Sequence, residues 1–237
     1  MSNPFIQANR LCIFRGARKA IRELDIDIHR GEWFGLVGAN GSGKTTFLRA
    51  LTGRLPINAG ECRIDGRDLQ SDRFKRAEVI EFAPTGDSLP KRLSAHQVFE
   101  LLDPNWKANL GDMFDILGLH NFDQRPIGSY SAGMRQRTAI ACAFVRGKYA
   151  VVLDEPFNWL DPVAAHDLRG ALREWVTPEK CLITALHDTA TLLSGCDRGA
   201  LLSDGEIVFD LNNEQLTKAK SDMAAFEAEM IARLRAS

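Results

Sequence analysis

The sequence has no long hydrophobic run. Its longest uninterrupted apolar stretch is Ala139–Val145, whereas a membrane-spanning helix needs roughly 18 such residues. The first ten residues, Met1–Arg10, also lack the apolar segment of a signal peptide. The chain has little excess of charge either, because 30 Lys and Arg residues face 31 Asp and Glu residues and leave a formal net charge of −1. A protein that binds nucleic acid usually shows a basic excess or a basic face. The chain itself is therefore expected neither to span a membrane nor to bind nucleic acid.

Disulfide chemistry is not indicated. The five cysteines are odd in number, scattered, and form no Cys-x-x-Cys pair: Cys12, Cys62, Cys142, Cys181 and Cys196. This usage is typical of reduced thiols in a cytosolic protein.

Hydrophobic patterning predicts an α/β fold. Leu24, Ile26 and Ile28 alternate with acidic residues, as in a half-buried strand. The expected strands are Leu11–Phe14, Leu24–Ile28, Trp33–Val37, Glu61–Ile64, Tyr149–Leu153, Cys181–Ala185, Ala200–Ser203 and Ile207–Asp210. Helices are expected at Lys44–Gly53, within Ser94–Gly118, from Ser131 to Arg146, at Ala164–Trp175 and up to Leu193. Strands that alternate with helices indicate a parallel layer, and the strands near both ends of the chain indicate a small antiparallel part.

A glycine-rich turn lies between an expected strand and an expected helix. It reads Gly38-Ala39-Asn40-Gly41-Ser42-Gly43-Lys44-Thr45 and is followed by Thr46. This spacing is that of a phosphate-binding loop. Glycines let backbone N–H groups turn toward a phosphate, and the following helix directs its positive end at the anion. Lys44 is expected to reach the β- and γ-phosphates, and the Thr45 hydroxyl to bind Mg²⁺.

Two carboxylates follow the apolar strand Ala150–Leu153. Ligands of parallel sheets bind at the carboxyl ends of the strands, so these acids are expected beside the phosphates. Asp154 suits the Mg²⁺ shell, and Glu155 suits a general base that polarises the attacking water. His187 follows the strand Cys181–Ala185 and is a candidate for contact with the γ-phosphate. The guanine-reading pattern Asn-Lys-x-Asp is absent from the sequence, which favours adenine.

These features together resemble the ATP-binding-cassette (ABC) ATPases. Ser131-Ala132-Gly133-Met134-Arg135-Gln136-Arg137 is similar to the signature motif of that family, and Asn158-Trp159-Leu160-Asp161-Pro162 resembles its D-loop. His187 matches the switch histidine. Phe14 lies where the family places an aromatic residue that stacks on adenine. The resemblance extends from about Leu11 to Asp210, with the motifs in the family's order.

The resemblance implies a P-loop NTPase fold with a mostly parallel sheet core, an antiparallel β subdomain and a helical signature subdomain. It implies ATP and Mg²⁺ as cofactors. It also implies a homodimer or heterodimer of ATPase subunits, in which Ser131 and Gly133 of one subunit cap the γ-phosphate held by Lys44 of the other. A separate transmembrane permease is the expected partner, and the expected location is the cytoplasmic face of the inner membrane.

Two positions depart from the family pattern. Thr85 stands where the family has a glutamine that contacts Mg²⁺ and water, and the shorter side chain predicts slower hydrolysis or looser coupling. Ala132 replaces the first signature glycine, which is tolerable if its φ is negative.

The expected domain is residues 3–213, with a helical subdomain at about 86–148, followed by a C-terminal helix at 214–237. The apolar stripe of this tail comprises Leu216, Ala219, Met223, Phe226 and Met230. It is expected to pack on its own domain, with a partner surface as the alternative.

The leading functional hypothesis is the ATPase of a transporter. Thr85 and Ser131 are only 46 positions apart, and a helical subdomain this compact looks more like that of an exporter than of an importer. The alternatives are an ATP-binding regulatory subunit with weak hydrolysis and a soluble ABC ATPase.

Overall fold

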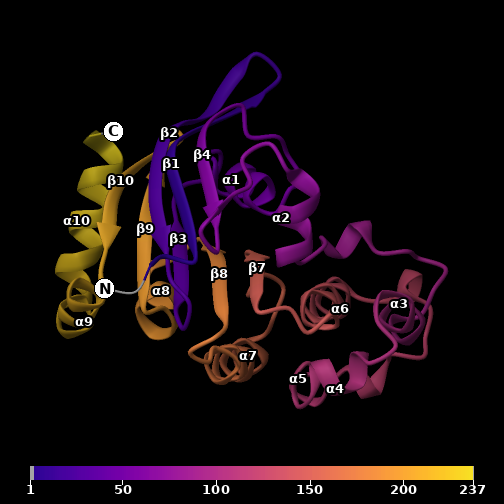
Figure 1. Cartoon of the computed structure of the whole chain (residues 1–237). Helices are drawn as coiled ribbons and strands as arrows, with labels where there is room; N and C mark the ends of the chain where they lie inside the picture. The colour runs from indigo at the N-terminus through magenta and orange to yellow at the C-terminus, as the bar shows by residue number, and fades with distance from the viewer. Residues whose placement is uncertain (1–2, 237) are drawn as a thin grey trace.

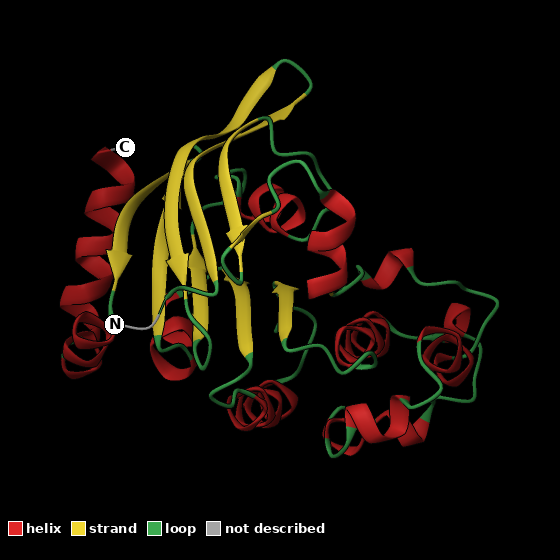
Figure 2. Ribbon diagram, in the orientation of Figure 1, coloured by secondary structure: helices red, strands yellow, loops and turns green. Residues whose placement is uncertain are grey.

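The protein consists of two β-sheets with helices around them (Figures 1 and 2). The computed structural model describes residues 3–236. The strands are β1 (Ile6–Arg15), β2 (Arg18–Ile28), β3 (Trp33–Val37), β4 (Ala59–Ile64), β5 (Arg67–Asp68), β6 (Ile80–Phe82), β7 (Ala150–Asp154), β8 (Cys181–Leu186), β9 (Arg198–Ser203) and β10 (Glu206–Leu211). The α-helices are α1 (Lys44–Leu51), α2 (Arg73–Val79), α3 (Ala95–Leu102), α4 (Trp106–Leu110), α5 (Met113–Ile116), α6 (Ala132–Phe144), α7 (Pro162–Trp175), α8 (Thr189–Gly195), α9 (Asn213–Ser221) and α10 (Met223–Ala236). Three short 3₁₀ helices are Gly86–Ser88, Leu119–Asn121 and Ile127–Ser129.

The larger sheet has the strand order β10-β9-β3-β8-β7-β6. Its strands pair in parallel from β9 to β6, and only β10 is antiparallel. The smaller sheet, β2-β1-β4-β5, is antiparallel throughout. The predicted α/β class, with a mostly parallel core and an antiparallel part, is confirmed. Adjacent β3, β8 and β7 also end at the same edge, which brings the segments that follow them together.

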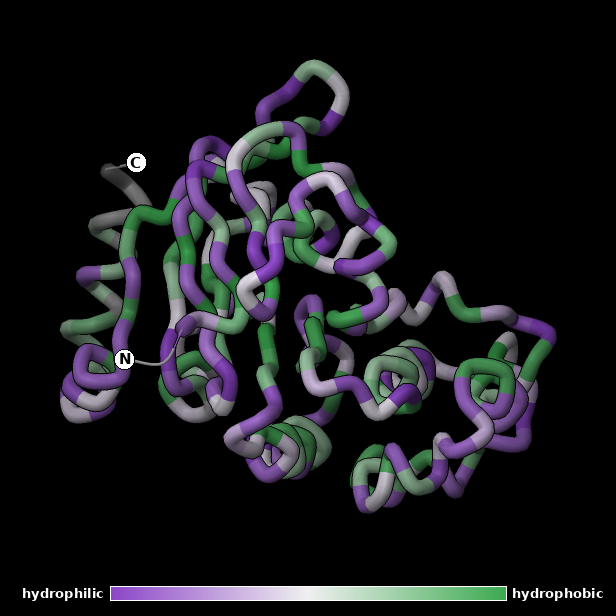
Figure 3. The backbone as a smooth tube through the Cα atoms, viewed as in Figure 1, coloured by the Kyte–Doolittle hydropathy of each residue, from purple (hydrophilic) through white to green (hydrophobic). Residues whose placement is uncertain are grey.

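Both faces of the central strands β3, β8 and β7 are buried, which explains why these strands are continuously apolar. Successive residues of a strand point to opposite faces. Thus Val151 and Leu153 pack on one side of β7 among the helices, while Val152 packs on the other side with α1 and the smaller sheet. Figure 3 shows the resulting concentration of hydrophobic residues in the central strands. Each fully buried aliphatic side chain contributes about 1.5–3 kcal/mol of hydrophobic stabilisation.

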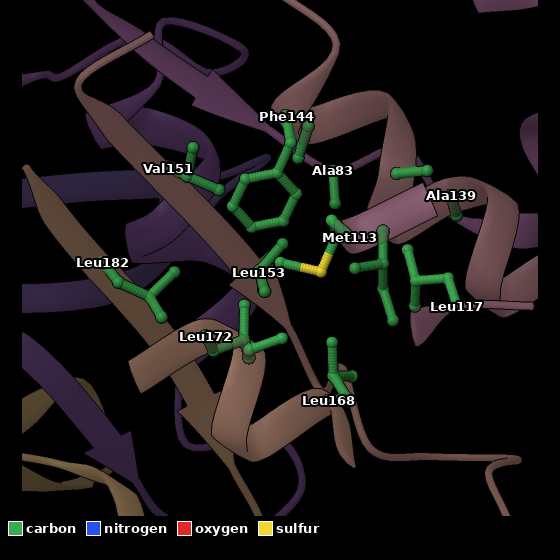
Figure 4. Packing of buried hydrophobic residues seen from close by; sticks show 14 of the residues in the cluster. Ala83, Met113, Leu117, Ala139, Phe144, Val151, Leu153, Leu168, Leu172 and Leu182 are labelled. Atoms are coloured by element: carbon green, nitrogen blue, oxygen red, sulfur yellow. The ribbon is translucent and has the colours of Figure 1, made fainter. Parts of the chain in front are cut away.

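The chain between β6 and β7 is helical and lies beside the sheets rather than over them (Figure 1). It shares the hydrophobic cluster of the sheet's helical face. In Figure 4, Met113 and Leu117 of this segment lie near Leu153 of β7 and Leu168 of α7. The signature segment is thereby attached to the strand that carries the acidic pair.

The C-terminal tail differs from the single helix that the sequence predicts. The sequence predicts a single helix, whereas α9 and α10 are separated at Asp222. The side chain of Asp222 accepts a hydrogen bond from Ala225 N (3.0 Å), as an N-cap does, and so starts a new helix. Leu216, Ala219, Phe226 and Met230 are buried against the domain, while Met223 is 49% exposed. Residue 237 of the expected tail lies outside the described residues.

Three further elements, β5, α2 and β6, are absent from the sequence-based expectations. Among residues 3–236, no helix combines the length and the apolar character needed to cross a bilayer.

Candidate functional site

The glycine-rich turn connects β3 to α1, as predicted. Gly43 has a φ of 114°, and a Cβ atom there would lie 2.9 Å from the carbonyl oxygen of Ala20 in β2. Only glycine fits this position. Lys44 is 5% exposed, and its Nζ donates hydrogen bonds to the carbonyl oxygens of Gly38 (2.6 Å) and Ala39 (3.2 Å). These hydrogen bonds hold the Lys44 side chain against the backbone of the loop.

Burial lowers the pKa of Lys44, and the nearby carboxylates of Glu155 and Asp154 oppose that change. The side chain thus lies in an environment that solvates its charge poorly. A phosphate at the loop would place further negative charge beside the ammonium group.

Asp154 ends β7 next to α1, and its environment fits a cation. Burial raises the pKa of Asp154, while a hydrogen bond from Thr45 opposes the rise. Its Oδ1 is buried and has no hydrogen-bond partner among the described residues. Mg²⁺ binds carboxylate and hydroxyl oxygens, with further ligands from water and substrate phosphates. Asp154 and Thr45 therefore fit a magnesium ion.

Glu155 is held by the residues around it. Its φ of 54° is uncommon for a residue other than glycine. The Nε2 atom of His187 lies 2.6 Å from its Oε2, and the Nδ2 of Asn158 donates to the same oxygen (2.8 Å). The Nε2 of Gln136 in α6 donates to the carbonyl oxygens of Glu155 and Pro156, both at 3.3 Å. The carboxylate is thus fixed at the sheet edge between the phosphate loop and α6.

A hollow of about 410 Å³ lies between this acidic pair and α6. Thr85, Ala132 and Gln136 line it together with Thr45, Asp154 and Glu155. Thr85 is thus on the magnesium side of the site, where the resemblance places a longer side chain. Ala132 is the first residue of α6 and is not among the described residues with positive φ. Its methyl group is therefore tolerated without backbone strain.

Ser131 and Gly133 stand apart from the phosphate loop of their own chain. Ser131 is exposed and caps α6, its Oγ accepting a hydrogen bond from Met134 N (3.2 Å). Neither Ser131 nor Gly133 lines the hollow at Gly41–Thr46 or the one beside Thr85. The signature residues and Lys44 are not brought together within one chain.

A second hollow, of about 220 Å³, opens directly at the phosphate loop. Asn40, Gly41, Gly43, Lys44, Thr45 and Thr46 line it, as does Glu155. Ser42 belongs to the loop but does not line this hollow, and its Oγ is buried without a hydrogen-bond partner among the described residues. Phe14 is 40% exposed and does not line this hollow, whereas its neighbour Arg15 does.

Four residues of the site lie outside the predicted set. Asn158 and Gln136 contact Glu155, and both lie within the motif segments, which is the signal that could have singled them out. Arg15 and Arg18 line the hollow at the phosphate loop. No motif marks either arginine.

Comparison with known proteins identifies the family. The family described as "ABC transporter" matches residues 21–158, which is more than half of the chain. An uncharacterized ABC transporter ATP-binding protein, YdbJ of Bacillus subtilis, is 31% identical over 218 residues, covering 87% of this chain and 69% of that protein. The lantibiotic transport ATP-binding protein SrtF of Streptococcus pyogenes is 27% identical, covering 90% of this chain and 94% of that one.

Solved structures show the same fold. The structure described as the ATP-binding subunit of an ABC transporter superposes with a TM-score of 0.84 at 22% identity, covering 98% of this chain and 99% of that one. The dimeric post-hydrolysis state of the ATP-binding cassette MJ0796, bound to ADP and Pi, gives a TM-score of 0.78 at 21% identity, covering 88% of this chain and 98% of that one. On the family match and the site just described, the chain belongs to the ABC transporter family, as an ATP-binding ATPase subunit.

Proposed function

We propose that this chain hydrolyses MgATP to drive a transporter whose membrane-spanning part is a separate permease subunit. The observation that carries the proposal is the 2.6 Å contact between His187 Nε2 and Glu155 Oε2, next to the phosphate loop at Lys44. A general base held by a second side chain at the γ-phosphate end of the loop is the arrangement that hydrolysis needs.

The chemical roles follow from the hydrogen bonds. A carboxylate can only accept hydrogen bonds, so the Nε2 of His187 donates. Asn158 donates to the same Oε2, and we assign Oε1 of Glu155 to the attacking water. The water oxygen then bonds to the γ-phosphorus while the bond to the β–γ bridging oxygen breaks, which yields ADP and phosphate. Glu155 accepts the water proton, and Lys44 leaves the loop carbonyls to neutralise the phosphate oxygens.

Mg²⁺, when bound, neutralises charge on the β- and γ-phosphate oxygens. We assign its protein ligands to Thr45 and Asp154. The orphaned Oδ1 of Asp154 supports that assignment.

Two copies of the cassette are needed in this proposal. We assign the exposed Ser131, with Gly133 and the start of α6, to the γ-phosphate held by the partner subunit. A serine N-cap and the backbone N–H groups of a helix start are suited to bind an anion. The MJ0796 cassette is dimeric in its solved structure, which supports this proposal. Either a homodimer or a heterodimer satisfies this requirement.

We further propose export as the direction and the cytoplasmic face of the inner membrane as the location. The compact stretch between Thr85 and Ser131 supports export. A regulatory subunit with weak hydrolysis is the second candidate, because Thr85 replaces the family's glutamine.

ATP turnover by the purified chain tests the proposal. Glu155→Gln should abolish hydrolysis while MgATP binding persists, and Glu174→Gln on an exposed position of α7 is the matched control. A wild-type chain that binds MgATP with no turnover above that of Glu155→Gln would favour the regulatory subunit. Failure of the wild-type chain to bind MgATP would overturn both. Co-purification of a membrane-spanning partner tests the transporter assignment. Accumulation of substrate inside inverted vesicles on addition of MgATP would support export, and the absence of accumulation would count against it.

A further inference from the structure

The turn between β9 and β10 contacts the phosphate loop from outside the nucleotide site. It consists of Asp204 and Gly205, and the backbone N–H of Gly205 donates a hydrogen bond to the carbonyl oxygen of Ser42 (2.9 Å). The carbonyl oxygen of Gly205 accepts a hydrogen bond from Arg22 N in β2 (2.8 Å). Turns usually lie on the surface of a protein, but Gly205 is buried. Its backbone thus connects the phosphate loop to β2.

The space at this junction admits no side chain. A Cβ atom on Gly205 would overlap with the carbonyl oxygen of Ala20 and lie 3.1 Å from the Cα of Ile21. Both are backbone atoms, so only a shift of β2 or of the turn itself would relieve the overlap. A Cβ on Gly38, the first residue of the loop, would likewise overlap with the carbonyl oxygen of Leu202 in β9. The loop is therefore packed directly against the backbone of two hairpins.

The hydrogen bond to Ser42 sets the direction of the next backbone N–H group. A peptide unit is planar and trans, so the C=O of Ser42 and the N–H of Gly43 point in opposite directions. The carbonyl is directed at Gly205, which lies outside the lining of the hollow at the phosphate loop, whereas Gly43 belongs to that lining. The N–H of Gly43 is thereby directed away from the turn.

We propose that Gly205 is a positioning residue for ATP, which acts through Ser42 to hold the Gly43 N–H toward the phosphates. The turn itself does not touch the nucleotide. A shift of the turn would release the peptide between Ser42 and Gly43, and the loop would lose a donor to the phosphate oxygens. This inference rests on the proposed binding of MgATP and adds the element that keeps the loop in its phosphate-binding conformation.

A second turn of the same kind provides a matched control. Asp65-Gly66 connects β4 to β5 in the way that Asp204-Gly205 connects β9 to β10. Both residues have positive φ in each turn, 52° and 74° in the first and 45° and 84° in the second. Gly66, however, is exposed, and apart from its chain neighbours no described residue has an atom within 4 Å of a Cβ placed there. Alanine at either glycine adopts an unfavourable positive φ, but only Gly205→Ala displaces backbone beside the phosphate loop.

The test measures the dissociation constant of MgATP and the melting temperature for the wild-type chain, Gly205→Ala and Gly66→Ala. The positive φ alone should lower the melting temperature of both variants by about 2–8 °C. Loss of one hydrogen bond to a charged phosphate weakens binding by about tenfold or more. We expect that weakening for Gly205→Ala at a temperature where all three proteins are folded, and wild-type affinity for Gly66→Ala. Equal MgATP affinities of the two variants would overturn the proposal.

Hydrogen exchange of the wild-type chain tests the same contact without a variant. Bound MgATP stabilises the phosphate-binding conformation of the loop, so exchange of the Gly205 N–H should slow when MgATP is added. The control is the Asp65 N–H, which donates to the carbonyl oxygen of Phe5 (2.8 Å) and should exchange at an unchanged rate. An unchanged rate at Gly205, or equal slowing of both amides, would overturn the proposal. Failure of the wild-type chain to bind MgATP would instead refute the proposed function.

Discussion

His187 and Glu155 are joined by a 2.6 Å contact between Nε2 and Oε2, although they follow different strands of the sheet. They meet because β7 and β8 are parallel neighbours with Asp154 opposite Ala185. The backbone N–H of Glu155 also donates to the carbonyl oxygen of Ala185 (3.1 Å). Strand register, rather than loop conformation, thus sets the relation between the proposed base and the histidine.

Replacement of His187 by alanine should slow hydrolysis without preventing nucleotide binding. The change removes one of the two donors that hold Oε2, so the carboxylate loses its orientation toward water. General acid–base groups contribute about 100-fold or more to rate, and we expect a loss of that order in kcat. Single-turnover hydrolysis measures it. His166→Ala on the exposed side of α7 is the control, and a His187→Ala enzyme with unchanged kcat would contradict the role.

Lengthening of Thr85 should speed turnover. Thr85 lines the hollow of about 410 Å³ beside Asp154 and Glu155. The Thr side chain is too short to reach the proposed magnesium site, whereas the longer side chain of glutamine would reach it. We expect Thr85→Gln to raise kcat severalfold, and Thr85→Ser, which adds no length, to leave it low. Steady-state ATPase assays compare the three proteins. Turnover of Thr85→Gln equal to that of the wild type would count against this reading.

Trp159 has a φ of 66° and is 75% exposed. A left-handed backbone conformation costs a residue other than glycine about 1–2 kcal/mol. Because most of the Trp159 side chain is exposed, its removal loses few contacts. Trp159→Gly should therefore raise the melting temperature, by about 2–4 °C for each kcal/mol gained. Trp159→Phe keeps the Cβ and is the control. A lower melting temperature for the glycine variant would show that the indole stabilises the chain.

The cysteines should be unreactive in the folded protein. All five are buried, and burial raises the pKa of the Cys62 thiol to about 11 and that of Cys142 to about 12. The thiolate is the reactive form, so few of these groups are available at pH 8. A thiol-specific chromogenic reagent should label the native chain slowly and all five thiols in denaturant. Rapid labelling of a native thiol would contradict the burial.

The parts of the site that sequence predicts are those that depend on local order along the chain. The loop at Lys44, the pair Asp154 and Glu155, and His187 each follow a strand whose apolar pattern is visible, and parallel pairing places those strand ends together. The fold class follows from the same alternation of strands and helices.

The missed features depend on interactions between distant segments. The position of Arg15 depends on a bulge at Ala20 between β1 and β2, and a bulge is a property of two paired strands that neither strand displays alone. The short α2 and β6 lack a long periodic pattern. The break between α9 and α10 at Asp222 depends on one side chain capping the next helix, within a stripe of apolar residues that continues past it.

The central claim is that Lys44 of one subunit and Ser131 of another complete one catalytic site. Mixing of two inactive variants, Lys44→Ala and Ser131→Arg, measures this directly. A mixed dimer contains one site with both residues intact, so the mixture should hydrolyse ATP at a clear fraction of the wild-type rate while each variant alone does not. Wild-type turnover by Ser131→Arg alone, or a mixture as inactive as its components, would contradict the account.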